Sequence, residues 1–146
     1  MARAKFLKFK HNDRWQMDSL ALGKIYQPAL EKMAKKIPHL HWGVLCTPDG
    51  FNLCSIGLTE NQVGKMAALS SSLLSVGEAV VSTLVPENTG SGGLDIMTME
   101  ANGIQIVSTR IHRSGGYLIL MAAAKAPLGV VLVGVKATAD EVRKLL

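Results

Sequence analysis

One segment constrains the fold more than any other: a helical pattern from Thr59 to Leu84 that lacks a charged face. Between Lys65 and Glu87 the only ionisable residue is Glu78, so the side that would normally meet water carries small and apolar residues instead. A helix that is apolar or small on all sides is usually buried on two sides. One side can pack on the sheet of its own domain. We therefore expect a partner surface, and most simply a second copy of the chain, to cover the other.

The segment before this helix predicts a β-hairpin over residues 41–47 and 51–57, turning at Pro48-Asp49-Gly50. With that loop, Cys46 faces Asn52 and Cys54 faces Val44. The two sulfurs would then lie diagonally on one face, with Cα atoms about 7 Å apart, which is too far for an easy disulfide. We expect both cysteines to be reduced core residues, as is usual in a cytoplasmic protein.

The remaining segments carry clear but less complete signals. Residues 18–36 have helical spacing and end before Pro38, and Pro28 allows either a helix that begins near Gln27 or two shorter helices that meet there. Residues 94–101 and 104–111 flank Asn102-Gly103, a strong hairpin signal. A second turn at 112–116 leads into an apolar run, 117–123, suited to a central strand. The last segment fits either a helix from Pro127 or a strand over 129–135 followed by a helix.

Length and charge limit the classes of function. The chain has 146 residues, enough for one domain, which we place at 18–146, and no apolar run approaches the roughly 20 residues of a membrane span. Most of its net charge of +5 lies in a basic extension, residues 1–17. This extension could bind nucleic acid or an anionic membrane surface through phosphate contacts. Its candidate contact residues are Arg3, Lys5, Lys8, Lys10 and Arg14.

No set of residues predicts a catalytic, metal or cofactor site. His39 and His41 would share a strand face but lack a third ligand nearby. The glycine-rich stretch 88–93 lacks the Gly-Lys-Ser/Thr ending of a phosphate-binding loop and precedes a strand. Ser70 and Glu78 have no histidine beside them on their helix. We expect a protein without enzyme activity.

Three stretches of the chain resemble the roadblock/dynein light chain family, over roughly Gln27 to Leu146. They are the strand-turn-strand 43–55, the Ala/Ser/Leu-rich helix 66–79, and 117–122 followed by 127–130. The resemblance implies an α+β, profilin-like architecture: a five-stranded antiparallel sheet with the long helix on one face and N- and C-terminal helices on the other. It also favours a helix from about Pro127. Residues 1–17 lie outside the family pattern.

The resemblance also implies a function. Family members dimerise by pairing edge strands and stacking their long helices, and many regulate or scaffold Ras-like small GTPases. We expect the dimer interface to include Leu73, Val76, Val80, Leu94, Ile96, Met97 and Met99. We expect a GTPase to dock near the exposed start of the paired helices, at Glu60, Asn61 and Lys65.

Overall fold

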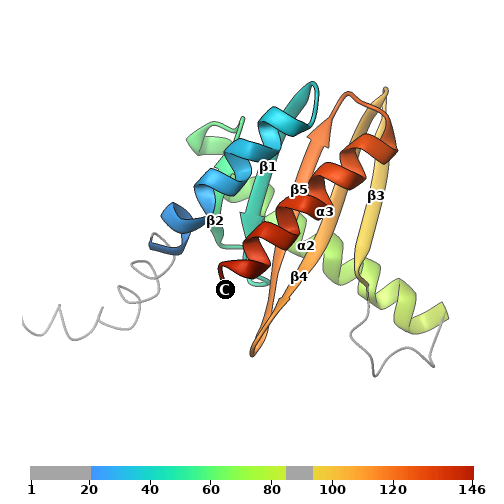
Figure 1. The fold of residues 1–146 in the computed structure, drawn as a ribbon. Helices are drawn as coiled ribbons and strands as arrows, with labels where there is room; N and C mark the ends of the chain where they lie inside the picture. The colour runs from blue at the N-terminus through green and yellow to red at the C-terminus, as the bar shows by residue number, and fades with distance from the viewer. Residues whose placement is uncertain (1–20, 85–93) are drawn as a thin grey trace, which may run out of the picture.

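The computed structural model describes residues 21–84 and 94–146, which form one sheet covered by helices on both faces (Figure 1). An N-terminal helix, residues 21–36, precedes the other elements. These are β1 (Leu40–Cys46), β2 (Asn52–Ile56), α2 (Glu60–Leu84), β3 (Ile96–Ala101), β4 (Ile104–Arg113), β5 (Gly116–Ala124) and α3 (Leu128–Lys144).

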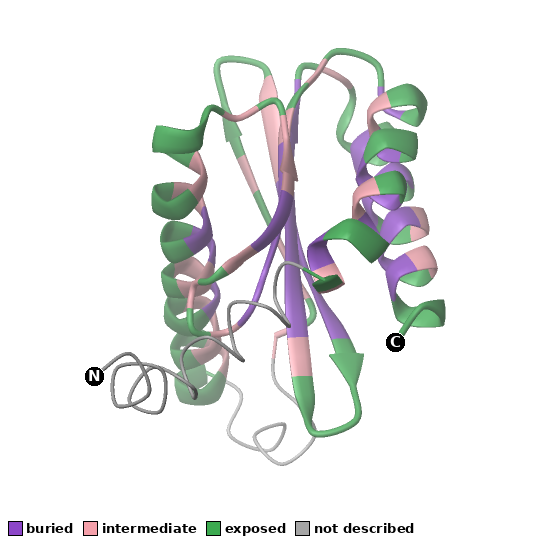
Figure 2. Ribbon diagram, turned by 90° about the vertical axis from the view of Figure 1, so that its left-hand side faces the viewer, coloured by how far each residue is buried: buried purple, intermediate pink, exposed green. Residues whose placement is uncertain are grey.

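The five strands are antiparallel and lie in the order β2-β1-β5-β4-β3. Alternate side chains of the central strand β5 enter two separate cores, because successive residues of a strand point to opposite faces. Ile119 and Met121 pack under α2, whereas Leu118 and Leu120 pack with the N-terminal helix and α3. The long helix thus lies on one face and the two terminal helices on the other (Figure 2), so the predicted fold is confirmed.

The N-terminal helix passes through Pro28 without a break, so both alternatives weighed for that position are wrong. Proline removes the hydrogen bond to the carbonyl four residues earlier, which here belongs to Lys24. Both residues are exposed, and water can hydrogen-bond that carbonyl. Tyr26, Leu30, Met33 and Ile37 are buried on the other side of the helix and hold it on the sheet. The end before Pro38 is as predicted.

The first hairpin forms where the sequence predicts it, with Gly50 at φ 88° and its N–H donating to the Thr47 carbonyl at 3.0 Å. Its register differs from the expectation. A β-bulge between Leu45 and Cys46 places Cys54 opposite Leu45, although Cys46 does face Asn52. The predicted shared face is therefore wrong: Cys46 lies in the core under α2, and Cys54 lies in the core of the opposite face.

The helix α2 begins with a capping interaction, for which the sequence carries the signature Thr59 followed three residues later by Gln62. The Thr59 N–H donates to Oε1 of Gln62 at 3.0 Å, and the Gln62 N–H donates to the Thr59 carbonyl at 2.9 Å. These bonds satisfy amide groups that the first helical turn leaves without intrahelical partners. Farther along, the hydroxyl of Ser71 donates to the Pro48 carbonyl and joins the helix to the hairpin turn.

The second half of the chain follows the predicted meander. Asn102 and Gly103 turn with φ of 52° and 80°, as their sequence requires. The predicted turn at 112–116 is shorter, because β4 continues to Arg113 and β5 already begins at Gly116. Residues 128–144 are one helix, so the strand alternative for 129–135 is wrong. The extension 1–17 and the glycine-rich stretch 88–93 lie outside the described residues.

Candidate functional site

The outward side of α2 carries a stripe of apolar side chains that is largely uncovered in the described part of the chain. Of its 25 residues only Ala67, Ser70 and Leu74 are buried. The stripe consists of residues spaced by three or four positions, which share one helix face. It contains Leu69, Leu73, Val76, Val80 and Leu84, and we call it the α2 stripe. Val76 is 62% exposed and Leu84 is 74% exposed, whereas Leu73 is half-buried.

Strand β3 forms one edge of the sheet and has β4 as its only strand neighbour in the described part of the chain. Met97 and Met99 lie opposite Ser108 and Ile106 and share the face that α2 covers. Leu94 packs on the same face, and Ile96 packs against the core of the other face. An edge strand presents unpaired N–H and C=O groups that can pair with another chain.

The α2 stripe and β3 lie next to each other because Gly77 allows the close approach of the segment before β3. A Cβ atom at Gly77 would lie 2.5 Å from Leu94 Cδ2 and from Met97 Cε. The structure therefore brings the predicted interface residues of α2 together with Leu94, Met97 and Met99 at one side of the molecule. Ile96 is the member of the predicted set whose side chain points to the opposite face.

The predicted docking residues lie at the other end of α2. Glu60, Asn61 and Lys65 are all exposed on its first turns. Asn61 and Lys65 are four positions apart and so share a helix face. Apart from Glu78, the charged and amide groups of α2 therefore all lie before its apolar stripe begins.

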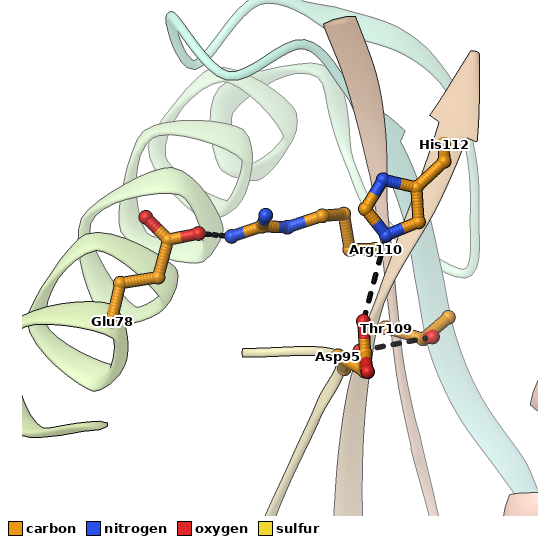
Figure 3. A network of polar contacts seen from close by, with 5 residues as sticks. All are labelled: Glu78, Asp95, Thr109, Arg110 and His112. Atoms are coloured by element: carbon orange, nitrogen blue, oxygen red, sulfur yellow. Dashed lines mark hydrogen bonds and ion pairs between the residues drawn. The ribbon is translucent and has the colours of Figure 1, made fainter. Parts of the chain in front are cut away.

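The sequence analysis did not identify the partner of Glu78. Its carboxylate forms an ion pair with the guanidinium of Arg110 in β4 (Figure 3). The Arg110 side chain is 6% exposed and lies 4.3 Å over the ring of Tyr117. One feature of the sequence could have indicated this pair: Glu78 is the lone charge in an otherwise uncharged stretch, which suggests that it has a specific partner.

The other candidate residues are placed apart from one another. His39 has φ 55° and precedes β1, so it does not share a strand face with His41. Across residues 21–84 and 94–146 no group of three or more His, Cys, Asp or Glu residues could hold a metal ion. Burial raises the pKa of both the Cys46 and the Cys54 thiol to about 12. Thiolate chemistry at neutral pH is accordingly disfavoured at both positions.

By length and composition alone, α2 could span a membrane. The expectation that no segment reaches this length is wrong for α2, because its serines and glycines are only weakly polar. In the structure one side of the helix packs on the sheet through Ala67, Ser70 and Leu74. The apolar residues on one side of α2 therefore belong to the core, and those on the other side form the α2 stripe.

Several solved structures with the roadblock fold are similar to this chain. A Roadblock/LC7 domain from Streptomyces avermitilis is 21% identical, with a TM-score of 0.67 over 80% of this chain and 93% of that domain. Myxococcus xanthus MglB is 17% identical, with a TM-score of 0.70 over 84% of this chain and 88% of its own. The gliding protein MglB from Thermus thermophilus is 14% identical, with a TM-score of 0.70 over 86% of this chain and 90% of its own.

No family model matches the sequence, and no curated protein matches it. The structural similarity confirms the resemblance predicted from the hairpin, the long helix and the meander. The chain has the fold of a Roadblock/LC7 domain.

Proposed function

We propose that this protein is a homodimeric, non-catalytic regulator or scaffold that binds a Ras-like small GTPase in the cytoplasm. The observation that carries the proposal is the α2 stripe beside the open edge of β3. Exposed apolar patches bordered by polar groups are typical of interaction sites. A twofold dimer uses the same patch on both subunits, which suits a surface made of one helix and one antiparallel edge strand.

The similar structures also support a proposal of self-association and GTPase binding. One of them is described as "MglB with tetrameric arrangement", which is a statement that this neighbour self-associates. Roadblock domains resemble this chain in fold, and the family is associated with Ras-like GTPases. In the proposed dimer, Leu73, Val76 and Val80 pack against their copies. Glu60, Asn61 and Lys65 stay free to contact the GTPase.

The dimer is tested by sedimentation of the purified protein at micromolar concentration. We expect twice the monomer mass of 15.6 kDa. Val76→Glu should place an unpaired carboxylate in the interface and weaken the dimer by about 3 kcal/mol, or more than 100-fold in Kd. Val133→Glu is the matched control, because Val133 is 70% exposed but lies on α3, across the sheet. A monomeric wild type, or equal effects of the two variants, would contradict the proposed interface.

GTPase binding is tested with purified Ras-like GTPases from the same organism, each loaded with GDP or with a non-hydrolysable GTP analogue. We expect one of them to bind the dimer, and Lys65→Glu to weaken that binding without changing the dimer mass. The variant Lys136→Glu, an exposed lysine of α3, serves as the control.

The basic extension supplies the alternative function, in nucleic-acid or anionic-membrane binding through Arg3, Lys5, Lys8, Lys10 and Arg14. These residues lie outside the described part of the chain. Replacing all five by glutamine should leave GTPase binding intact if the proposal is correct. If it abolishes instead a salt-sensitive binding to RNA or to anionic vesicles, while no GTPase binds, the alternative is favoured.

A further inference from the structure

The partly buried ion pair between Glu78 and Arg110 joins α2 to the sheet. Glu78 is the last ionisable residue of α2, and its side chain is 33% exposed. Arg110 comes from β4, on the face that α2 covers, and its side chain is 6% exposed (Figure 3). A nearly buried guanidinium is costly to desolvate unless a partner compensates its charge.

The ring of Tyr117 fixes the guanidinium from a second direction. Tyr117 belongs to β5, the strand beside β4, and its ring centroid lies 4.3 Å from Arg110 Cζ. Arginine stacks well on aromatic faces because its planar cation is weakly hydrated. The carboxylate and the ring both contact the guanidinium of Arg110, so Glu78 is held at a set position above the sheet.

The backbone of the same residue holds the start of β3. The Arg110 N–H donates to the Asp95 carbonyl at 3.1 Å, and Oγ1 of Thr109 donates to the same carbonyl at 3.3 Å. The ring of His112 adds a contact at 3.5 Å from Nε2 to Oδ1 of Asp95 (Figure 3). Asp95 directly precedes β3. Arg110 therefore contacts both α2 and the first residues leading into the edge strand.

Replacing a buried ion pair by apolar side chains of similar size is often neutral or stabilising, whereas the pair restricts the relative placement of the elements that carry it. The pair joins α2, which carries the α2 stripe, to β4, whose Arg110 N–H bonds the Asp95 carbonyl just before the β3 edge. In a twofold interface the same patch of each subunit packs against its copy, so the α2 stripe and the β3 edge must be held at fixed positions relative to each other.

We propose that Arg110 is a positioning residue for self-association: its side chain, paired with Glu78, holds the C-terminal half of α2 at a set place over β4, whose backbone N–H at the same residue holds Asp95 at the start of β3. We call this group of three residues the Arg110 clamp. The inference rests on the proposed homodimer, since that is the surface which the clamp positions. None of the three residues needs to touch the partner subunit.

The test compares the wild type with Glu78→Leu/Arg110→Met, which removes both charges and keeps apolar volume. Thermal unfolding reports whether the fold is intact, sedimentation gives the dimer Kd, and hydrogen exchange reports on residues 76–84 and 94–99. We expect an unfolding temperature close to the wild type, a dimer Kd raised at least tenfold, and faster exchange in residues 76–84, because the side-chain pair that holds this part of α2 is lost while the backbone N–H of residue 110 still bonds Asp95. The charge-swapped variant Glu78→Arg/Arg110→Glu should recover part of the affinity.

An apolar variant that dimerises and exchanges like the wild type would overturn the inference while leaving the homodimer intact. A monomeric wild type would instead contradict the homodimer. The hydrogen-exchange rates of the wild type and the apolar variant would then test only whether the Arg110 clamp holds α2 in place. If the apolar variant does not fold, Arg110→Lys decides, because lysine keeps the charge but not the planar stacking on Tyr117. For that variant we expect a weaker dimer with a nearly unchanged unfolding temperature. An unchanged Kd would contradict the inference.

Discussion

Gly23 of the N-terminal helix lies directly against the carbonyl group of Leu53 in β2. A Cβ atom at position 23 would overlap the Leu53 oxygen and lie 3.3 Å from its carbonyl carbon. One helical turn later, Nε2 of Gln27 donates to the Ser55 carbonyl at 3.1 Å. The N-terminal helix thus lies close to an edge strand of the sheet and contacts two of its carbonyl groups.

Gly23→Ala should destabilise the fold by about 1–3 kcal/mol, because the added methyl group meets backbone atoms that cannot rotate away. In a helix, alanine is otherwise favoured over glycine by about 1 kcal/mol. The control is Gly64→Ala in α2, where a Cβ would meet open space, and it should stabilise the protein by up to about 1 kcal/mol. Urea unfolding of both variants measures the difference. Equal shifts of the same sign would contradict the close helix–strand contact.

The hydroxyl group of Tyr26 is buried and has no hydrogen-bond partner among the residues that the structure describes. Burial is also the main cause that raises its pKa. Tyr26→Phe should therefore leave stability unchanged or increase it by about 1 kcal/mol, since it removes a desolvated polar group and keeps the ring. Thermal unfolding checks this, with Leu30→Ala as a positive control expected to lose about 2–5 kcal/mol. A loss above about 1 kcal/mol for Tyr26→Phe would show that the hydroxyl contributes a stabilising hydrogen bond, contrary to this prediction.

The sequence predicted the elements well where local chemistry decides them. Gly50, Asn102 and Gly103 each have the positive φ that their turns require, and Gln62 bonds back to Thr59. These features depend on the conformational range of a few neighbouring residues, so no knowledge of the rest of the fold is needed.

Features decided by distant contacts were missed or left open. The bulge between Leu45 and Cys46 changes the register by one residue and moves Cys54 to the other face, which no turn signal indicates. The segment 129–135 has strand propensity, so its residues alone left helix and strand open; it is helical, as the family resemblance favoured, and Val131 and Val135 pack into the core beside the N-terminal helix. For the candidate site, the spacing of apolar and charged residues along the sequence was enough to predict the uncharged face of α2. The partner of Glu78 could not be predicted in the same way, since Arg110 lies on a strand far along the chain, beyond β3.

Because Cys46 and Cys54 are buried, we expect the protein to lose stability at high pH. Burial raises each thiol pKa from 9.0 to about 12, so both stay protonated in the folded protein where the unfolded chain would ionise. Between pH 9 and 12 the unfolded state therefore binds fewer protons, and the free energy of unfolding falls as pH rises.

Each cysteine should steepen this fall by up to about 1.4 kcal/mol per pH unit. Urea unfolding at pH values of about 7, 9 and 10 measures the slope, and Cys46→Ala and Cys54→Ala should each reduce it. Each alanine variant also loses stability because it leaves a cavity, but that loss is the same at every pH. A change in the slope of stability against pH therefore reports the ionisation of the thiol alone. A slope that neither variant changes would contradict burial as the controlling factor.

The last prediction concerns how a bound GTPase would be regulated. A GTPase that needs assistance often receives an arginine from its partner, or has its switch loops placed by the partner. In the body of this protein Arg110 is held by Glu78 and Tyr117, and Arg143 forms an ion pair with Asp140 at 2.9 Å on α3. Arg113 is exposed at the end of β4, so it is the arginine best placed to reach a partner among the residues that the structure describes.

We nevertheless expect Arg113→Ala to leave GTP hydrolysis by the bound GTPase unchanged within about twofold. The proposed docking residues, Glu60, Asn61 and Lys65, lie on α2, and binding there would act by biasing the switch loops. Loss of an inserted arginine typically lowers the rate by about 10³-fold or more, so single-turnover hydrolysis distinguishes the two mechanisms clearly. Lys65→Glu is the companion variant, expected to lower stimulation by weakening binding. If Arg113→Ala abolishes stimulation while binding is intact, the arginine acts directly and regulation by docking alone is wrong.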